Sequence, residues 1–137
     1  MSIDDRAEEV SSASSGVWSG LVPDPGSPGF SVRGTYPSNV EGVEVMLEHW
    51  DAGTGEPPHF HPGDDMTIVV EGKMIVRFYL RVGESLVADG EPVTLNRGDV
   101  GYVGAERIHD AQYVENCRLV YVHNGAFAFR RVDVAVV

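Results

Sequence analysis

The chain has 137 residues, 42 % of them hydrophobic, which is a natural size for one domain with a core of its own. Asp and Glu outnumber Lys and Arg by 21 to 10, and the resulting net charge of −11 repels phosphate backbones and anionic lipid surfaces. The composition therefore argues against nucleic acid and membranes as partners.

The cellular location is predicted from the termini and the cysteine content. A single cysteine, Cys117, cannot form a disulfide within the chain, and the first residues, MSIDDRAEEV, are acidic where a secretion signal is basic and then apolar. No apolar run approaches the roughly 20 residues of a membrane-spanning helix. We therefore expect a cytoplasmic protein.

The domain is predicted to begin at residue 17. Residues 1–16 are acidic and then Ser-rich, with little to bury, and are expected to form a disordered, flexible arm. Residues 17–137 are expected to form a single domain. Its first segment, from Val17 to Tyr36, is apolar but interrupted by the turn-forming run PDPGSPG, so it is predicted to wrap the edge of the domain or to pair with a second subunit.

Residues 43–50 have the alternating pattern of a β-strand, in which successive side chains point to opposite faces. One face carries Val43, Val45, Leu47 and His49, and the other carries Glu44, Met46, Glu48 and Trp50. Because glutamates usually face solvent, we expect His49 to point into the domain.

The remaining strands are short and are separated by turn signals such as the run NRGD at residues 96–99. They are expected at residues 73–82, 92–95, 100–103, 107–113 and 118–123, and from 126 onward. Short strands with frequent turns are typical of a small antiparallel barrel or a double-sheet jelly roll, so the predicted fold class is all-β.

Two histidines stand out in the run HFHPGDD. Side chains at i and i+2 of a strand share a face, so His59 and His61 can offer two imidazoles to one point, as a metal site requires. The neighbouring prolines stiffen the backbone, and Pro62-Gly63 suits a type II turn that would bring Asp65 to face the same interior.

A simpler interpretation of the same run stays open. A pair of histidines in this spacing is often solvated or hydrogen-bonded without a metal. Asp64 and Asp65 can likewise act as turn caps, and Asp64 competes with Asp65 for the role of ligand, although strand alternation favours Asp65.

The spacing around these histidines resembles the first motif of the cupin superfamily. Gly53 is followed after five residues by His59-x-His61, after three more by Asp65, and after six more by Gly72. The usual glutamate of this motif is aspartate here.

A second run resembles the second cupin motif. Gly98 is followed after five residues by the turn GAE at 104–106, and after two more by His109. The usual P-x-G turn reads G-A-E, and the terminal asparagine is replaced by Tyr113. Three of only five histidines thus occupy positions at which the cupin pattern has metal ligands.

The resemblance implies a double-stranded β-helix, an RmlC-like jelly-roll barrel with its site in the mouth. It implies that His59, His61, Asp65 and His109 bind a divalent transition metal such as Fe, Mn, Ni or Zn. If the shorter Asp65 does not reach the metal, the centre is a three-histidine site with open positions.

Three further residues are candidates for catalysis. His49 is expected to line the pocket or donate to a ligand, Tyr113 shares the face of His109 and can offer a hydroxyl to a substrate, and His123 ends a strand near the barrel rim. The alternatives are a hydrogen-bonded core histidine for His49, a packed aromatic for Tyr113 and a loop position for His123.

The cupin resemblance favours a metal-dependent enzyme of dioxygenase, isomerase or lyase type that acts on a small polar molecule. The alternatives are a non-catalytic small-molecule-binding or sensor protein and a barrel without metal. A homodimer is expected, with the segment from Val17 to Tyr36 and the apolar tail VDVAVV at its interface.

Overall fold

The computed structural model describes residues 18–34 and 41–137, so the predicted arm at 1–16 lies outside the described residues. Every regular element in the described part is a strand. No helix there is long and apolar enough to cross a membrane.

Thirteen strands follow one another in the described residues. They are β1 (Val22–Pro23), β2 (Phe30–Gly34), β3 (Val43–Trp50), β4 (Gly55–Phe60), β5 (Asp65–Glu71), β6 (Lys73–Val82), β7 (Ser85–Ala88), β8 (Val93–Asn96), β9 (Val100–Val103), β10 (His109–Tyr113), β11 (Cys117–Asn124), β12 (Arg130–Arg131) and β13 (Ala135–Val136).

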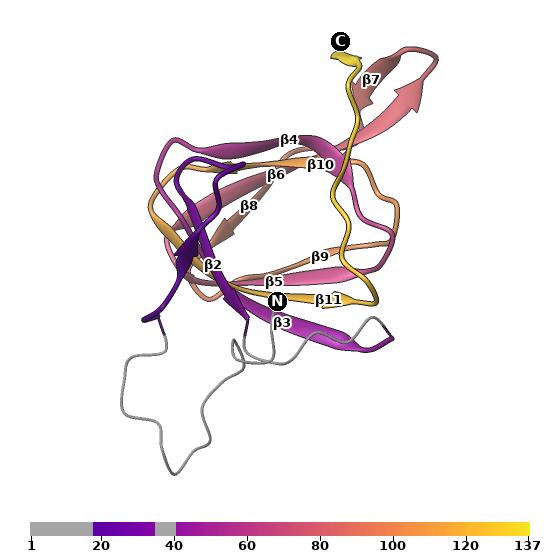
Figure 1. The fold of residues 1–137 in the computed structure, drawn as a ribbon. Helices are drawn as coiled ribbons and strands as arrows, with labels where there is room; N and C mark the ends of the chain where they lie inside the picture. Colours follow the sequence, from indigo (N-terminus) through magenta and orange to yellow (C-terminus); the bar gives the residue numbers. More distant parts are fainter. Residues whose placement is uncertain (1–17, 35–40) are drawn as a thin grey trace.

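The strands form two sheets that face each other and curl into a jelly-roll barrel (Figure 1). One sheet has the order β1-β2-β3-β11-β5-β9, and the other has the order β12-β4-β10-β6-β7-β13 with β8 paired to β6. Neighbouring strands are antiparallel except β7 and β13. The predicted all-β jelly-roll fold is confirmed.

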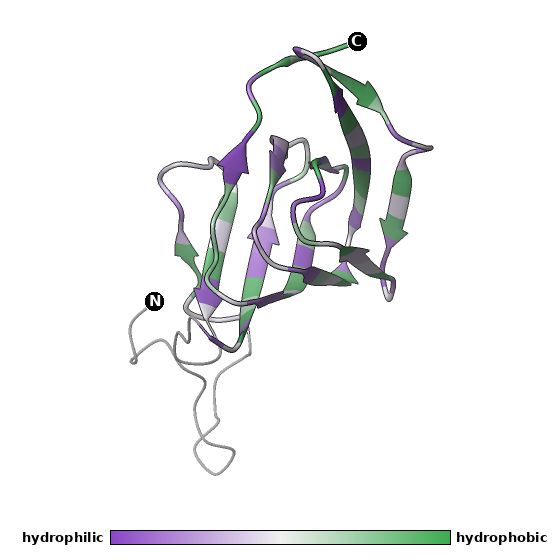
Figure 2. Cartoon of the chain, turned by 90° about the vertical axis from the view of Figure 1, so that its right-hand side faces the viewer, coloured by the Kyte–Doolittle hydropathy of each residue, from purple (hydrophilic) through white to green (hydrophobic). Residues whose placement is uncertain are grey.

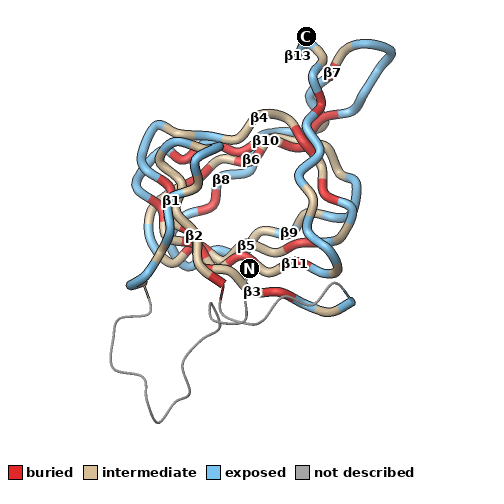
Figure 3. Tube along the Cα trace, in the orientation of Figure 1, coloured by how far each residue is buried: buried red, intermediate tan, exposed pale blue. Residues whose placement is uncertain are grey.

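The core lies between the sheets. Along β11 the buried positions alternate with partly exposed ones. Figure 2 shows that hydrophobic and hydrophilic residues also alternate along several strands. Buried residues recur around the whole barrel wall (Figure 3). The main core cluster consists of Trp50, Val69, Met74, Val76, Leu95, Ala111, Tyr113, Cys117 and Leu119.

The predicted orientation of β3 is wrong. Glu48 and Trp50 are buried on the inner face, whereas His49 lies on the outer face, where its Nε2 is 2.9 Å from Oδ1 of Asp51. Alternation defines two faces but not which of them is buried. The usual preference of glutamate for solvent fails here because the indole N–H of Trp50 donates to Oε1 of Glu48, at 3.0 Å, inside the barrel.

The two terminal segments pair within their own chain. Strand β2, in the segment expected at the domain edge, pairs with β3 and extends the sheet. The single strand expected from residue 126 is instead an irregular stretch, 125–129, followed by the short strands β12 and β13. These pair with β4 and β7, so the C-terminal segment passes from the β11 sheet to the opposite one (Figure 1). The expected homodimer stays a prediction.

The loop between β9 and β10 holds an unfavourable backbone conformation. Glu106 has a φ of 63°, in the left-handed region that favours glycine, and it occupies the position at which the P-x-G pattern has its glycine. Its backbone N–H donates to the carbonyl oxygen of His61 at 2.8 Å. The strained turn therefore fixes the backbone beside one of the candidate ligands.

Replacing Glu106 by glycine should relieve this strain. We expect Glu106→Gly to raise the free energy of unfolding by roughly 0.5–1 kcal/mol, measured by urea denaturation of the metal-free protein. Glu91→Gly, at an exposed position without a positive φ, is the matched control and should lower it. A loss of stability in Glu106→Gly would contradict the assignment of strain to this residue.

Candidate metal centre

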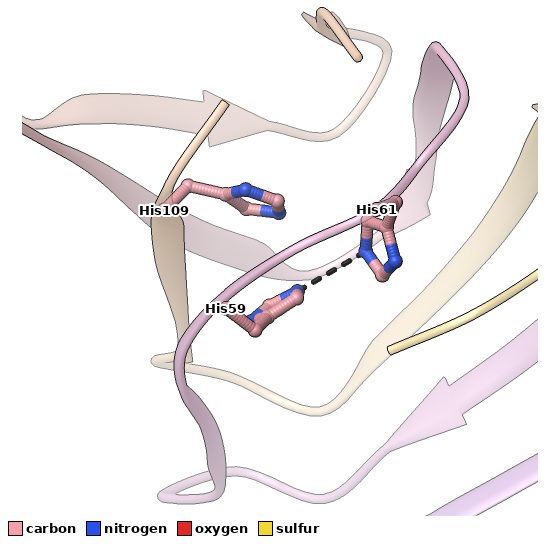
Figure 4. Close-up of side chains that lie close together, drawn as sticks. All are labelled: His59, His61 and His109. Atoms are coloured by element: carbon pink, nitrogen blue, oxygen red, sulfur yellow. Dashed lines mark hydrogen bonds between the residues drawn. The ribbon is translucent and has the colours of Figure 1, made fainter. Parts of the chain in front are cut away.

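Three histidines meet inside the barrel. His59 lies on β4, His61 directly follows that strand, and His109 begins β10. Strands β4 and β10 are antiparallel neighbours in which His59 and His109 are register partners, so two distant parts of the sequence present their imidazoles side by side (Figure 4). All three residues are buried, with at most 7 % of their surface exposed.

The three imidazoles form one group. Each offers a ring nitrogen, and these atoms all lie within 4.8 Å of one another, which makes the group able to hold a metal ion. The sequence-based prediction that His59, His61 and His109 come together is therefore confirmed in space.

Backbone carbonyls fix the tautomer of each ring. Nδ1–H of His59 donates to the carbonyl of Pro57 at 2.7 Å, that of His61 to Ala128 at 2.8 Å, and that of His109 to Arg107 at 2.8 Å. Because a carbonyl oxygen only accepts, Nδ1 must carry the proton in each ring. In the neutral rings, all three Nε2 atoms therefore present lone pairs.

This arrangement leaves two lone pairs in close contact. Nε2 of His59 lies 3.1 Å from Nε2 of His61, the contact drawn in Figure 4. It can be a hydrogen bond only if one ring is a doubly protonated cation. Burial, and then the charge of His109, lower the pKa of His59 to about 3, and burial also lowers the pKa of His61. Near neutral pH both nitrogens therefore present lone pairs, which a metal ion could satisfy together.

Asp65 lies beside this group rather than within it. It is buried at the start of β5, and its Oδ2 is 3.9 Å from Nε2 of His61. The hydroxyl of Tyr121 donates to the same oxygen at 3.1 Å, and burial raises the pKa of Asp65 to about 6. The carboxylate thus faces the histidines, as predicted, but lies outside the group of three ring nitrogens.

The turn before Asp65 differs from the prediction. The Oδ1 of Asp64 accepts from the backbone N–H of Ala105 at 2.7 Å, so Asp64 binds the loop between β9 and β10 and not its own turn. Gly63 lacks the positive φ that a type II turn requires. A Cβ on Gly63 would lie 2.0 Å from the carbonyl oxygen of Asn124, so glycine is needed there for close backbone approach.

Sequence reasoning missed Glu56, a second carboxylate beside the group. Its Oε2 lies 3.7 Å from Nε2 of His59, and the hydroxyl of Tyr113 donates to its Oε1 at 2.6 Å. His59 opposes His109 and Glu56 opposes Ala111, so β4 contains one residue more than β10 in this interval. This bulge turns Glu56 into the barrel, and simple alternation cannot reveal it.

The other predicted catalytic residues differ in their surroundings. Tyr113 is buried inside the barrel, stacked on Trp50 at 4.3 Å, with its hydroxyl committed to Glu56. His123 is also buried, and its Nε2 has no hydrogen-bond partner among the residues that the structure describes. Oε2 of Glu44 lies 4.0 Å from this Nε2. His49 lies on the outer face, as described above.

The histidines open onto a small cavity. The cavity has a volume of about 60 Å³, counted as the space that the centres of water molecules can occupy. This is room for roughly four waters. Phe129 stacks on His59 at 4.0 Å and Phe127 lies 5.1 Å from His61, so the stretch 125–129 covers the histidines. The lining residues are Glu48, Trp50, Glu56, His59, His61, Asp65, Thr67, Met74, Val76, Val103, His109, Ala111, Tyr113, Leu119, Tyr121 and Phe127.

Comparison with known proteins identifies the fold. No protein-family model and no curated protein matches the chain. Among solved structures, an RmlC-like cupin from Shewanella frigidimarina NCIMB 400 is similar with a TM-score of 0.63 and 21 % identity, over 82 % of this chain and 89 % of that one. KdgF from Halomonas sp. gives 0.58 and 20 %, over 72 % and 82 %. An oxalate oxidase gives 0.62 and 20 %, over 80 % and 59 %.

These similarities show that the chain has the cupin fold, as the sequence motifs predicted. The identities are too low to carry an activity from one protein to another.

The buried Glu48 generates a prediction about pH. Burial, and then the charge of Glu56, raise the pKa of Glu48 from 4.5 to about 8. Between these two values only the folded state keeps the proton, so this group lowers the free energy of unfolding progressively as pH rises from 4.5 to about 8. Glu48→Gln should remove that loss, since the amide oxygen can still accept from Trp50.

Urea denaturation of the metal-free protein at pH 5 and pH 8.5 measures this effect. The stability of Glu48→Gln relative to wild type should increase by about 4 kcal/mol between the two pH values. The exposed Glu71 provides the control, because Glu71→Gln should show no such change. Parallel stabilities of wild type and Glu48→Gln at both pH values would contradict the prediction.

Proposed function

We propose that the protein is a metal-dependent enzyme that acts on a small polar molecule at the three histidines. The observation that supports it is the 3.1 Å contact between Nε2 of His59 and Nε2 of His61, in rings whose Nδ1 protons are committed to carbonyls. Two buried lone pairs at this distance favour a bound cation over an apolar or water-filled core.

The ligands in this proposal are His59, His61 and His109, with Asp65 as the carboxylate that joins them directly or through a water. Imidazole nitrogens with one carboxylate suit a divalent first-row ion such as Fe, Mn, Ni or Zn. When bound, such an ion supplies Lewis acidity or activates oxygen.

The surrounding residues orient the reacting groups. Glu56 lies within 3.7 Å of a proposed ligand atom, so it can accept a proton from a substrate bound at the centre, and Tyr113 fixes its direction. His123 offers a buried nitrogen to the Asp65 side of the barrel, where it is the register partner of that residue. His49 has no role in this proposal because it lies outside the barrel.

The reaction type is proposed to be that of a dioxygenase, isomerase or lyase, in a cytoplasmic homodimer. The small cavity limits the substrate to a few heavy atoms near the centre.

Light scattering on the protein as it elutes from a size-exclusion column tests whether it is a dimer.

Metal analysis tests the proposed ligands. Protein without a histidine tag is incubated with Fe, Mn, Ni or Zn and then desalted. With at least one of these metals it should retain about one ion per chain, because three fixed imidazoles provide three ligands. His59→Ala and His109→Ala should each lose that ion. His49→Ala is the matched control and should retain it. Wild type that stays metal-free with all four metals would overturn the proposal.

Turnover separates an enzyme from a binding protein. The metal-loaded protein should consume oxygen or convert at least one compound in a panel of small diols, amines, amino acids and phenols, because an open metal position next to a carboxylate supports such chemistry. His59→Ala, treated with the same metal, is the control for free metal in solution. Compounds that bind without any conversion would indicate the alternative, a small-molecule-binding or sensor protein.

A further inference from the structure

A second cavity adjoins the one onto which the histidines open. It is lined by the turn between β1 and β2 and by the stretch 125–129 that covers the histidines, and its volume, counted in the same way, is about 340 Å³. This volume lies in the range of roughly 300–1,000 Å³ that is typical of small-molecule sites. Trp50, Glu56 and Phe127 line both cavities, so the two are neighbours with a common wall.

The walls of this second cavity are mainly aromatic. Its lining includes Phe30, Trp50, Phe127 and Phe129, and we call it the aromatic pocket. Phe30 is stacked on Trp50, with ring centroids 4.3 Å apart and 19° between the ring planes. Phe127 and Phe129 are 48 % and 41 % exposed, although both lie against buried histidines. Because flat aromatic faces gain more from another ring than from an aliphatic group of equal area, these walls favour a planar ligand.

Glu56 places a hydrogen-bonding group at the boundary between the two cavities. Its Oε1 accepts from the hydroxyl of Tyr113 at 2.6 Å, and its Oε2 lies 3.7 Å from Nε2 of His59. The other acidic residue of the aromatic pocket, Asp24, accepts from the backbone N–H of Gly26 at 3.0 Å within its own turn. A hydroxyl group on a ring in this pocket can therefore bond to Glu56 and point toward the histidines.

An apolar pocket between β8 and β9 is the competing place for a ring. Its volume is about 190 Å³, and it shares Thr67, Val76 and Val103 with the histidine cavity. These three side chains offer one hydroxyl and no carboxyl group, whereas the aromatic pocket shares Glu56. Phe129 also stacks directly on His59, at 4.0 Å. The aromatic pocket therefore has the closer connection to the candidate metal centre.

We propose that the ligand of this site is a small aromatic molecule that carries a hydroxyl group. Its ring lies in the aromatic pocket, and its hydroxyl group bonds to Glu56 and faces the three histidines. This inference rests on the proposed function, because it takes the histidines as the reacting end. It narrows the small polar molecule of that proposal to an aromatic alcohol or phenol.

Two alcohols that differ only in the saturation of the ring test the inference. Benzyl alcohol and cyclohexylmethanol are titrated into the metal-free and the zinc-loaded protein, and binding is followed by NMR chemical shifts. Benzyl alcohol should bind about fivefold more tightly in both forms, because only its ring can stack on the aromatic walls. A pocket that only excluded water would favour the saturated ring, which has more apolar surface.

Nuclear Overhauser effects locate the bound ring. The ring protons of benzyl alcohol should give cross-peaks to the side chains of Trp50 and Phe127. Cross-peaks confined to Val93, Val100 and Tyr102 would place the ring in the pocket between β8 and β9 and would overturn the inference.

Two variants and one control test the aromatic walls. Phe127→Leu and Phe129→Leu keep apolar side chains at half-exposed positions but remove a ring, and each should reduce the preference for benzyl alcohol to less than about twofold. Tyr102→Leu is the matched control, because Tyr102 is an exposed aromatic residue that lines the competing pocket. This variant should keep the full preference.

The results separate this inference from the proposed metal centre. Equal or tighter binding of cyclohexylmethanol, no binding of benzyl alcohol, or an unchanged preference in both leucine variants would overturn the inference, even if the same samples retain one zinc ion per chain. A preference for benzyl alcohol, with cross-peaks to Trp50 and Phe127, in protein that retains no metal would support the aromatic ligand and count against the proposed function alone.

Discussion

The site depends on three hydrogen bonds from imidazole Nδ1–H groups to backbone carbonyls. The acceptors belong to Pro57, Arg107 and Ala128, on three segments of the chain that meet only in the folded barrel. Each bond fixes one tautomer and one ring direction, and together they point three Nε2 lone pairs at a common space. Because Ala128 lies in the stretch that covers the histidines, the C-terminal segment is part of the site and does more than close the barrel.

The electrostatics of the interior follow from this constraint. Buried neutral imidazoles present lone pairs to the cavity, and the carboxyl groups of Glu48, Glu56 and Asp65, whose pKa values burial raises, line the same cavity. The cavity has room for only a few waters, so these groups are poorly solvated. A metal ion bound at the three histidines would satisfy their lone pairs.

Much of this site could be predicted from the sequence. The strands at 43–50, 73–82 and 100–103 have the bounds expected from their patterns. The motif spacing also predicted that His59, His61 and His109, which lie up to 50 positions apart, come together in the fold. These features are local or follow a recurring motif, so the sequence contains them directly.

The missed features depend on tertiary structure. Alternation along β3 could not tell which face is buried, so His49 was expected inside and Glu48 outside. The bulge in β4 that turns Glu56 inward is visible only once β10 is paired with it. The contact of Ala128 with His61 joins residues 67 positions apart, and no local pattern specifies a carbonyl acceptor. In each case a long-range contact decides the environment of a polar group.

The most direct measurement is anomalous X-ray diffraction from crystals of the protein loaded with Co²⁺ or Zn²⁺, with data collected on both sides of the metal absorption edge. We expect one strong peak inside the barrel, about 2.0–2.2 Å from Nε2 of each of His59, His61 and His109. The same map would show whether the carboxylate of Asp65 lies within bonding distance. No peak between the three rings, or peaks only at acidic groups on the surface, would contradict the assignment of a metal centre.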